Sequence, residues 1–498
     1  MRVNRAGLIG WWLVLLASVV CLAADVRLVD AVKDGNVEAV RALLKGRVDV
    51  NAPQGDGTTA LHWAVQQDDL DTVGLLIGAG ARVDVANDNG VTPLYLACTN
   101  RNTAMVERLL MAGGKPNAQL VSGETVLMNC ARTGDVAAVK ALLARGANVN
   151  ASEQSRGQTA LMWAVAQKHP AVVAALIASG ANINARSRVY DQTVSRDSPA
   201  SADADYPRDT VRRGGSTALL FAARSGDAES ARLLLAAGAN VNDALPDGTS
   251  ALVLATHSDQ RAVAMTLLDK GADPDNAAVG YTALHAAVLR GDVALVKALL
   301  AHGANPSPKI TKGTPLRRSG TDFELPETLI GATPYFLAAK FLETAIMPVL
   351  LAAGTDPRVG LADGTTPLMV AAGMGAGGVR AGGLLDRRGF SVVDGATIED
   401  ESRVLEAVTV ALDADGDVNA VNKAGDTALH SATWLGYDRV IRLLAHKGAH
   451  INARNRRGKT PLALLTGGKG PVGGAVDALP QLSHQSTVEL LRSLGATE

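Results

Sequence analysis

Apolar and polar residues alternate along most of the chain with the rhythm of short amphipathic helices. A brief apolar stretch such as 60–67 is followed, after a polar pair, by a second stretch with apolar residues at helical spacing, as at Val139, Leu142 and Leu143. Thr59 stands just before the first stretch, where its hydroxyl can accept a hydrogen bond from the helix N-terminus. The pattern therefore predicts pairs of short, capped helices.

The helix pairs repeat at a nearly constant spacing. Segments close to the form Gly-x-Thr-x-Leu follow one another at steps of 33, 33 and 34 residues, then 33 and 32, and later 33 and 33. Three longer steps, of 58, 51 and 61 residues, each equal one period plus an insertion. The glycines that open these segments are Gly57, Gly90, Gly123, Gly157, Gly215, Gly248, Gly280, Gly331, Gly364, Gly425 and Gly458. Such a period is typical of repeat proteins in which each unit buries its apolar face only against its neighbours.

Two signatures recur within each period. The first reads GTTALHWA at 57–64 and GYTALHAA at 280–287, and the second reads GANVNA at 146–151 and GAHINA at 448–453. Together they resemble the ankyrin-repeat family, with its Thr-Pro-Leu-His-x-Ala motif and 33-residue period. The resemblance covers nearly the whole chain after the N-terminal segment. It implies an all-α solenoid of about 12 stacked helix–turn–helix repeats with hairpin-like fingers.

The repeat frame predicts the organisation of the chain. An N-terminal segment, 1–24, is followed by repeats 1–5 at 25–186, and an insertion at 187–214 separates these from repeats 6–8 at 215–305. A second insertion, 306–330, precedes repeats 9–11 at 331–457, which contain a third insertion at about 373–399. The last unit, 458–498, departs from the pattern and is interpreted as a C-terminal capping repeat. The polar composition of the insertions favours disorder or partial order over a binding role.

The first 24 residues differ from the rest of the chain. Arg2 and Arg5 precede an uncharged apolar run from Gly7 to Ala24, with small residues at its end. This arrangement is typical of a secretory signal peptide, and the alternative is an uncleaved membrane anchor. We therefore expect a periplasmic or secreted protein, or a membrane-anchored one if the segment is retained. A bacterial source is expected.

Chemistry-bearing residues show no catalytic or metal-binding pattern. His62, His285 and His430 occupy the motif position, where a histidine bonds the local turn, and the other histidines show no metal-ligand spacing. Cys98 and Cys130 are expected to be buried, reduced thiols, because stacked backbones about 10 Å apart exceed the reach of a disulfide. We predict no enzyme activity, no catalytic residue, no metal and no cofactor. The net charge of -1 gives no case for nucleic acid.

The resemblance implies a protein-binding scaffold or adaptor that uses its finger loops and the first helices lining its concave face. The residues just after the motif's small pair, whose identity the framework does not dictate, are the candidate contacts: Gln66, Gln67, Arg132, Arg224, His257, Arg290, Lys340, Phe341, Trp434 and Leu435. Phe341 and Trp434 stand out in a chain with only 3% aromatic residues. Trp63 and Trp163 are interpreted as half-buried packing residues.

Two other functions stay open at this stage. A membrane-tethered interaction module follows if the N-terminal segment is not cleaved. A small-molecule or glycan receptor, or a hydrolase, would need a pocket built by the insertions with convergent polar or acidic groups, and the sequence shows no such convergent set. We expect a monomer that binds one or more proteins.

Overall fold

A computed structural model describes most of the chain as two compact units, Met1–Val121 and Ser122–Glu498. The predicted N-terminal signal segment lies outside the described residues, which are 26–195, 208–313, 325, 327–374, 384–385, 391–392, 399–466 and 484–498.

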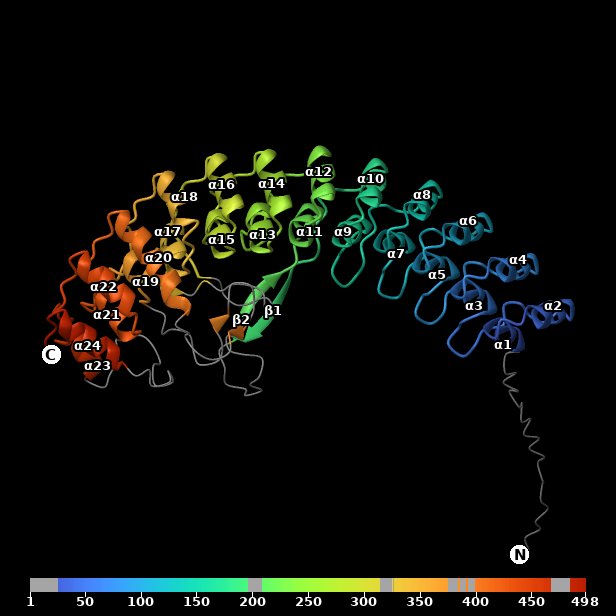
Figure 1. Cartoon of the computed structure of the whole chain (residues 1–498). Coiled ribbons are helices and arrows are strands. Elements are labelled where there is room, and N and C mark those ends of the chain that lie inside the picture. Colours follow the sequence, from blue (N-terminus) through green and yellow to red (C-terminus); the bar gives the residue numbers. More distant parts are fainter. Residues whose placement is uncertain are drawn as a thin grey trace, which may run out of the picture. The chain divides into compact units, whose positions relative to one another are not determined.

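Three helix pairs form the described part of the first unit (Figure 1). Within each pair a short first helix is followed after a tight turn by a longer second helix. The pairs are α1 (Arg27–Lys33) with α2 (Val37–Lys45), α3 (Ala60–Gln66) with α4 (Leu70–Gly78), and α5 (Pro93–Thr99) with α6 (Thr103–Met111).

The second unit continues the same arrangement with the helices α7 (Val126–Thr133), α8 (Val136–Ala144), α9 (Ala160–Ala166), α10 (Pro170–Ala178), α11 (Ala218–Ser225), α12 (Ala228–Ala236), α13 (Ala251–His257), α14 (Arg261–Asp269), α15 (Ala283–Leu289), α16 (Val293–Ala301), the 3-10 helix η1 (Glu327–Leu329), α17 (Pro334–Lys340), α18 (Met347–Ala352), α19 (Pro367–Ala371), α20 (Glu399–Asp413), α21 (Ala428–Trp434), α22 (Asp438–His446), α23 (Pro461–Thr466) and α24 (Gln485–Ser493). The predicted all-α ankyrin-type fold is confirmed.

Each first helix from α3 onward follows a hydroxyl residue at its N-terminus, whereas α1 follows Val26. The Thr59 backbone N–H donates to His62 Nδ1 at 3.1 Å, and the His62 ring also contacts the Thr59 hydroxyl. In other repeats a methionine replaces the histidine, and the Thr125 N–H donates to Met128 Sδ at 3.4 Å. This reciprocal bonding satisfies donors that a helix N-terminus leaves unpaired. The recurrent motif is thus a capping device, as the sequence indicated.

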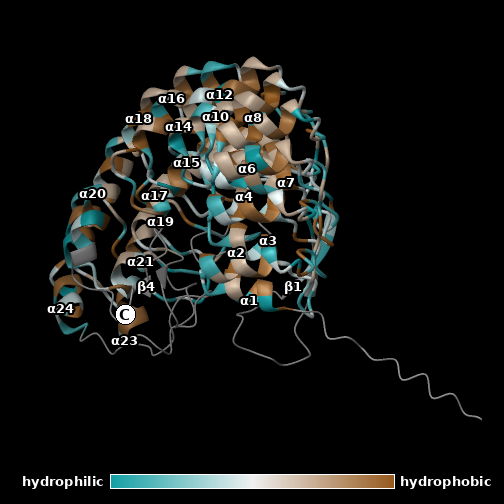
Figure 2. Cartoon of the chain, turned by 90° about the vertical axis from the view of Figure 1, so that its right-hand side faces the viewer, coloured by the Kyte–Doolittle hydropathy of each residue, from teal (hydrophilic) through white to brown (hydrophobic). Residues whose placement is uncertain are grey.

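The second unit holds together by stacking each helix on its equivalent in the next repeat. First helices contact first helices, as α9 contacts α7 and α11, and second helices contact second helices, as α10 contacts α8 and α12. Apolar side chains fill the space between the two rows, among them Leu142, Leu161 and Leu176, which are almost fully buried. Each such burial contributes about 1.5–3 kcal/mol. Figure 2 shows the apolar positions concentrated on the helices.

The first insertion is partly ordered. Strands β1 (Tyr190–Ser195) and β2 (Arg208–Arg213) pair as an antiparallel ribbon. Arg186 fixes the base of this ribbon: its guanidinium pairs with Asp243 and donates to the carbonyl oxygens of Gly215 and Ala244. The composition favoured disorder or partial order, and it could not reveal this pairing, in which Asp243 is buried.

The other insertions are described only in part. Ile310, Leu325 and Leu329 of the second insertion are buried, so parts of it pack on the repeats. In the third, the short strands β3 (Leu384–Leu385) and β4 (Ser391–Val392) pair. Helix α20 begins at Glu399, where the insertion predicted at about 373–399 ends.

The cysteine prediction was half right. Cys98 in α5 and Cys130 in α7 are both fully buried. However, both are disulfide-bonded, so the expectation of reduced thiols is wrong. The error lay in using the general spacing of stacked backbones, because a disulfide depends on the separation of two particular Cα and Cβ atoms, which the repeat period does not give.

Candidate partner-binding face

The candidate binding residues of the second unit lie on one structural feature, the first-helix row. We define this row as helices α7, α9, α11, α13, α15, α17, α19, α21 and α23 with the residue that follows each of them. Side chains at two kinds of position on these helices are not fully buried in the core. The fourth residue after the N-cap is half-buried at Trp163 and Phe221, and the seventh and eighth lie at the end of the helix.

Arg132 and Trp163 form the most distinctive contact on the row. The Arg132 guanidinium lies over the Trp163 ring, 5.4 Å from its centroid, and also donates to Asn129 Oδ1 at 2.7 Å. Glu124 is 3.8 Å from the same guanidinium. Two buried donors here, Arg132 Nε and Trp163 Nε1, have no hydrogen-bond acceptor within the described part of the chain. The predicted contact Arg132 is therefore built into a pair with a tryptophan that the sequence assigned to packing.

The first unit contains a similar pair in which the indole is satisfied. Lys33 Nζ lies 4.9 Å from the centroid of the Trp63 ring. Trp63 Nε1 donates to Gln54 Oε1 at 3.1 Å. Gln154 stands at the equivalent place in the second unit, but its side chain lies against Gly123 instead. The two pairs thus differ in one respect, which is whether the indole N–H has an acceptor.

Gln66 and Gln67 also lie in the first unit and are both exposed. The Gln67 side-chain amide donates to the carbonyl oxygen of Lys33 at 2.8 Å. This bond ties the end of α3 to the repeat before it, so Gln67 has a structural partner, whereas Gln66 presents its side chain to solvent.

Phe221 and Arg224 extend the second unit's row on α11. Phe221 is half-buried, one helix along from Trp163, and α9 and α11 are in contact. Arg224, a predicted contact, is exposed. Phe221 was not predicted; the signal that would have found it is its position, four residues after the capping Thr217, which matches that of Trp163.

His257, Tyr281 and Arg290 form a group at the ends of α13 and α15. His257 Nδ1 lies 3.2 Å from Tyr281 Oη, and the two rings are 6.5 Å apart. The Arg290 guanidinium donates to the His257 carbonyl oxygen. The structure thus brings two predicted contacts together, and it adds Tyr281, which sequence reasoning did not single out.

Lys340 and Phe341 end helix α17 and are both half-buried. Burial lowers the pKa of the Lys340 ammonium, because a desolvated cation is disfavoured. Within the described residues, Lys340 has neither an ion pair nor a hydrogen bond from its side chain. A partner that supplied an acceptor would relieve this cost.

Trp434 and Leu435 end helix α21 and are half-buried. A side chain at Gly373 would collide with Leu435 Cδ1, so Leu435 packs closely over the preceding repeat. The predicted alternative for Trp434, packing on the insertion at 373–399, concerns residues that lie largely outside the described ranges.

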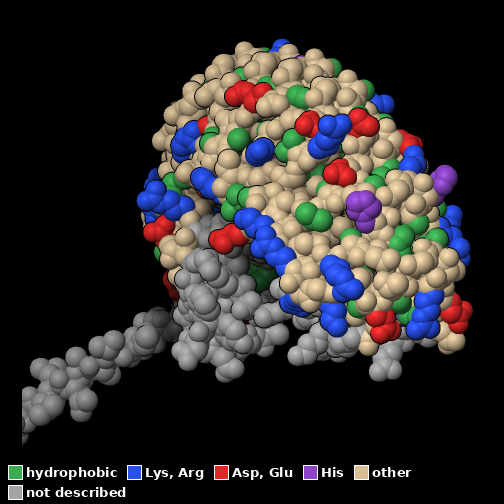
Figure 3. Space-filling model, turned by 90° about the vertical axis from the view of Figure 1, so that its left-hand side faces the viewer, with side chains coloured by type: hydrophobic (Ala, Val, Ile, Leu, Met, Phe, Trp, Pro, Cys, Tyr) green, Lys and Arg blue, Asp and Glu red, His purple; other side chains and the backbone are tan. Residues whose placement is uncertain are grey.

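Charge is segregated on the second unit. The helices of the first-helix row contain no Asp or Glu, while Arg132, Arg224, His257 and Lys340 lie at their ends and Arg290 follows α15. Some carboxylates in the turns that follow act as caps; Asp135 and Asp227 each accept a backbone N–H at 3.0 Å. By contrast, basic and acidic side chains are interspersed on the surface in Figure 3. The row therefore carries a positive bias that the net charge conceals.

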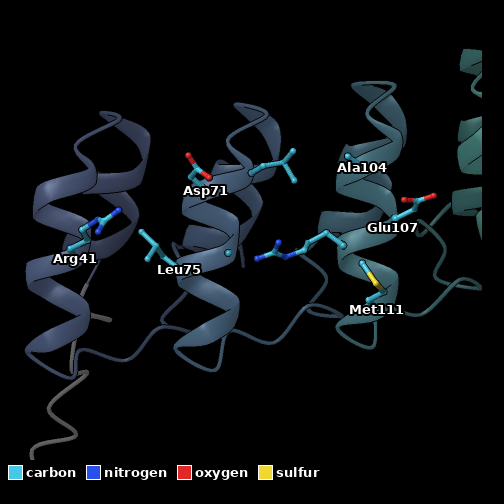
Figure 4. A pocket seen from close by; sticks show the side chains of 9 residues that line it. Arg41, Asp71, Leu75, Ala104, Glu107 and Met111 are labelled. Carbon is cyan, nitrogen blue, oxygen red and sulfur yellow. The ribbon is translucent and has the colours of Figure 1, made fainter.

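A shallow groove crosses the second helices of the first unit (Figure 4). It encloses about 580 Å³ and is lined by Arg41, Leu70, Asp71, Gly74, Leu75, Ala104, Glu107, Arg108 and Met111. Both signs of charge line it, and Met111 is 67% exposed. No convergent set of side chains suggests chemistry here.

The motif histidines have structural surroundings. Burial lowers the pKa of His285 to about 4 and also lowers the pKa values of His62 and His430. Nowhere in the described ranges do three or more His, Cys, Asp or Glu residues gather as metal ligands. Among these residues, too, no helix combines the length and apolarity needed to cross a membrane.

Comparisons with known proteins agree with the repeat frame. A family model described as ankyrin repeats (3 copies) matches residues 28–119, 102–187, 200–278 and 219–310, and a single ankyrin-repeat model matches 424–456. An ankyrin repeat-containing protein of Treponema pallidum (strain Nichols) is 44% identical over 106 residues, which are 21% of this chain and 36% of that protein. The human ankyrin repeat and KH domain-containing protein 1 is 47% identical over 58 residues, 11% of this chain and 2% of that protein.

The chain thus spans well under two thirds of the length of either relative. The family models, however, together cover more than half of its 498 residues. With its capped helix pairs and their stacking, the chain belongs to the ankyrin-repeat family.

Proposed function

We propose that this protein is an exported scaffold that binds another protein through the first-helix row of its second unit. Ankyrin repeats imply a protein-binding scaffold and are in general interaction modules rather than enzymes. The observation that carries the choice of surface is the set of half-buried aromatic and basic side chains on that row, above all Arg132 stacked on Trp163. Arg, Trp and Tyr are the residue types most often found at binding hot spots.

Export is supported by two independent features. The N-terminal segment has the charged and apolar regions of a signal peptide. The cysteines of α5 and α7 are disulfide-bonded, and disulfides persist mainly in oxidising compartments such as the periplasm or the extracellular space. We propose that the mature protein acts there as a monomer. The Treponema pallidum relative is in keeping with a bacterial source.

Fractionation of the native host, followed by N-terminal sequencing, tests export. Cleavage near Ala24 and recovery in a soluble periplasmic or secreted fraction would support it. An intact N-terminus in the membrane fraction would favour the tethered alternative. Mass spectrometry after alkylation without reductant adds an independent readout, since Cys98 and Cys130 should both resist modification.

Capture experiments test the binding surface. The mature protein is immobilised and exposed to extract from its own compartment, beside variants Trp163→Ala, Phe341→Ala and Trp434→Ala. A specific protein partner should be retained by the unaltered chain and lost from at least one variant. The exposed residue Lys140 on the second helix α8 offers a control, and Lys140→Ala should retain the partner. If all four variants capture as well as the parent chain, the first-helix row is not the binding surface.

A further inference from the structure

We propose that the first-helix row recognises an acidic segment of its partner, with one carboxylate seated at the Arg132–Trp163 pair. This inference rests on the proposed protein-binding function and names the chemistry of the partner. Three observations on the described part of the chain carry it: the charge of the row, two donors that have no acceptor there, and an ammonium that has no partner there.

The charge of the row selects the sign of the ligand. Its helices carry no carboxylate, and basic residues recur at their ends from α7 to α17. Some carboxylates that follow in the turns are occupied, as Asp292 is by the Leu295 N–H at 3.0 Å and by Arg261. A row whose helices carry basic side chains and no carboxylate is complementary to a negative segment, since complementary potentials steer association and reject partners of like charge.

The two donors without acceptors locate the anchor. Arg132 Nε and Trp163 Nε1 are buried, belong to adjacent first helices and lie in one stacked pair. A buried donor without an acceptor costs about 1–3 kcal/mol, so it calls for a partner. A carboxylate offers two oxygens and several lone pairs, enough to accept from both groups at once. Glu124 cannot do so, since it contacts the far end of the guanidinium at 3.8 Å.

Lys340 provides a second point of attraction on the same row. Its half-buried ammonium has no acceptor within the described residues, and burial lowers its pKa. A second carboxylate at α17 would restore the solvation that this group has lost. The half-buried ring of Phe221 offers apolar contact between the two charged points, and that of Phe341 offers it beside Lys340.

A protein is favoured over a nucleic acid as the acidic ligand. Nucleic-acid affinity grows with the number of phosphates that Lys and Arg neutralise, and the first-helix row has four such residues, Arg132, Arg224, Arg290 and Lys340. A few basic residues separated by aromatic and aliphatic side chains match a peptide that alternates acidic and apolar residues. Binding of an oligonucleotide at least as tight as that of such a peptide would contradict this choice.

The test uses the purified mature chain and defined probes. Fluorescence anisotropy follows a short labelled peptide of alternating Glu and Leu, and a matched peptide carries Gln in place of Glu. The acidic peptide should bind at least about tenfold more tightly than the Gln peptide, and added salt should weaken its binding. Equal binding of the two peptides, or no binding of either, would overturn the inference.

Three variants examine the anchor itself. Arg132→Lys keeps the charge but removes the Nε donor, and Trp163→Phe keeps the ring but removes the indole N–H. Each should weaken the acidic probe about tenfold, as expected for losing one hydrogen bond to a charged group. The matched control is Trp63→Phe in the first unit, whose indole donates to Gln54; it should leave probe binding unchanged.

Folding of each variant is checked by circular dichroism before binding is compared. If neither anchor variant differs from Trp63→Phe in probe binding, the assigned anchor is wrong. The capture experiment separates this inference from the proposed function. If the unaltered chain retains a protein that Trp163→Ala loses, while the acidic probe fails to bind, the scaffold function stands and the acidic partner is excluded.

Discussion

Replacing His285 by methionine should change how the stability of the protein depends on pH. The His285 ring is fully buried, and its Nδ1 accepts the Thr282 backbone N–H at 3.2 Å. Its Nε2 lies 3.3 Å from the Ala332 carbonyl oxygen, which requires the proton on Nε2. Protonating Nδ1 would place its N–H against the Thr282 backbone N–H and would put a positive charge in the core.

The size of the effect follows from the shift in pKa. Burial lowers the pKa of folded His285 from 6.5 to about 4, whereas the unfolded chain titrates near 6.5. Between these values the unfolded state binds more protons, so stability falls as pH falls. The contribution of His285 is complete above pH 6.5, and about 2 kcal/mol of it is lost by about pH 5, at 1.36 kcal/mol for each pH unit.

Methionine is a suitable replacement because the chain already uses it at this position. Met128 and Met369 accept the cap N–H through sulfur at 3.4 Å, and thioethers do not titrate in this range. At pH 8 the variant His285→Met should be about 1 kcal/mol less stable, because it loses the bond to Ala332. Near pH 5 the order should reverse, with the variant more stable by about 1 kcal/mol.

Urea unfolding followed by circular dichroism at pH 8 and pH 5 measures this crossing. Repeat proteins can unfold in parts, so hydrogen exchange of peptides covering α15 should be followed in parallel. His62 and His430 contribute equally to both proteins and cancel in the comparison. Parallel stability curves for the two proteins across this range would refute the reasoning.

Three further outcomes follow from single contacts. Gly74→Ala should stabilise the first unit by about 0.5–1 kcal/mol in urea unfolding, because the helix gains propensity and only the flexible end of Arg108 must move; lower stability would show that this contact is rigid. Asp243→Ala should destabilise by about 2–4 kcal/mol and speed tryptic cleavage of the ribbon, since Arg186 and the Thr217 hydroxyl lose their acceptor; unchanged cleavage would contradict the anchor. Lys340→Met should raise the thermal midpoint at pH 7, with the gain shrinking toward about pH 10 as the lysine deprotonates in both states; a lowered midpoint would mean that the ammonium is well solvated.

The sequence was sufficient to predict the fold because the contacts that define each repeat join residues that are close in the sequence. The caps, such as Thr59 with His62, bond groups three residues apart, so their pattern is visible in the text of a single repeat. Stacking then follows from the period, because equivalent apolar positions meet in neighbouring repeats.

Features that join distant residues could not be predicted in this way. The ribbon of the first insertion depends on Arg186 reaching Asp243, 57 residues away, and no local pattern marks such a pair. The disulfide state of the cysteines depends on the approach of side chains, which the period does not specify. Likewise, Trp163 and Trp63 occupy the same position in similar motifs, yet among the described residues only Trp63 has a partner for its indole N–H.

The motif placed the candidate contacts at the ends of first helices, where the structure has them, but their surroundings came from the structure. The structure strengthens the case for Arg132 as a contact, because its guanidinium stacks on Trp163. It weakens the case for Leu435, because that side chain packs over Gly373. Whether these residues bind a partner stays a prediction.

Site-specific crosslinking tests the central claim, binding through the first-helix row, most directly. A photo-crosslinking phenylalanine analogue is placed at Phe221 on α11 or at the exposed residue Glu229 on α12 of the same repeat, and the mature protein is irradiated in extract of its own compartment. We predict a discrete protein adduct from position 221 that excess acidic peptide suppresses, and none from position 229. Adducts that form equally from both positions, or from 229 alone, would contradict the account.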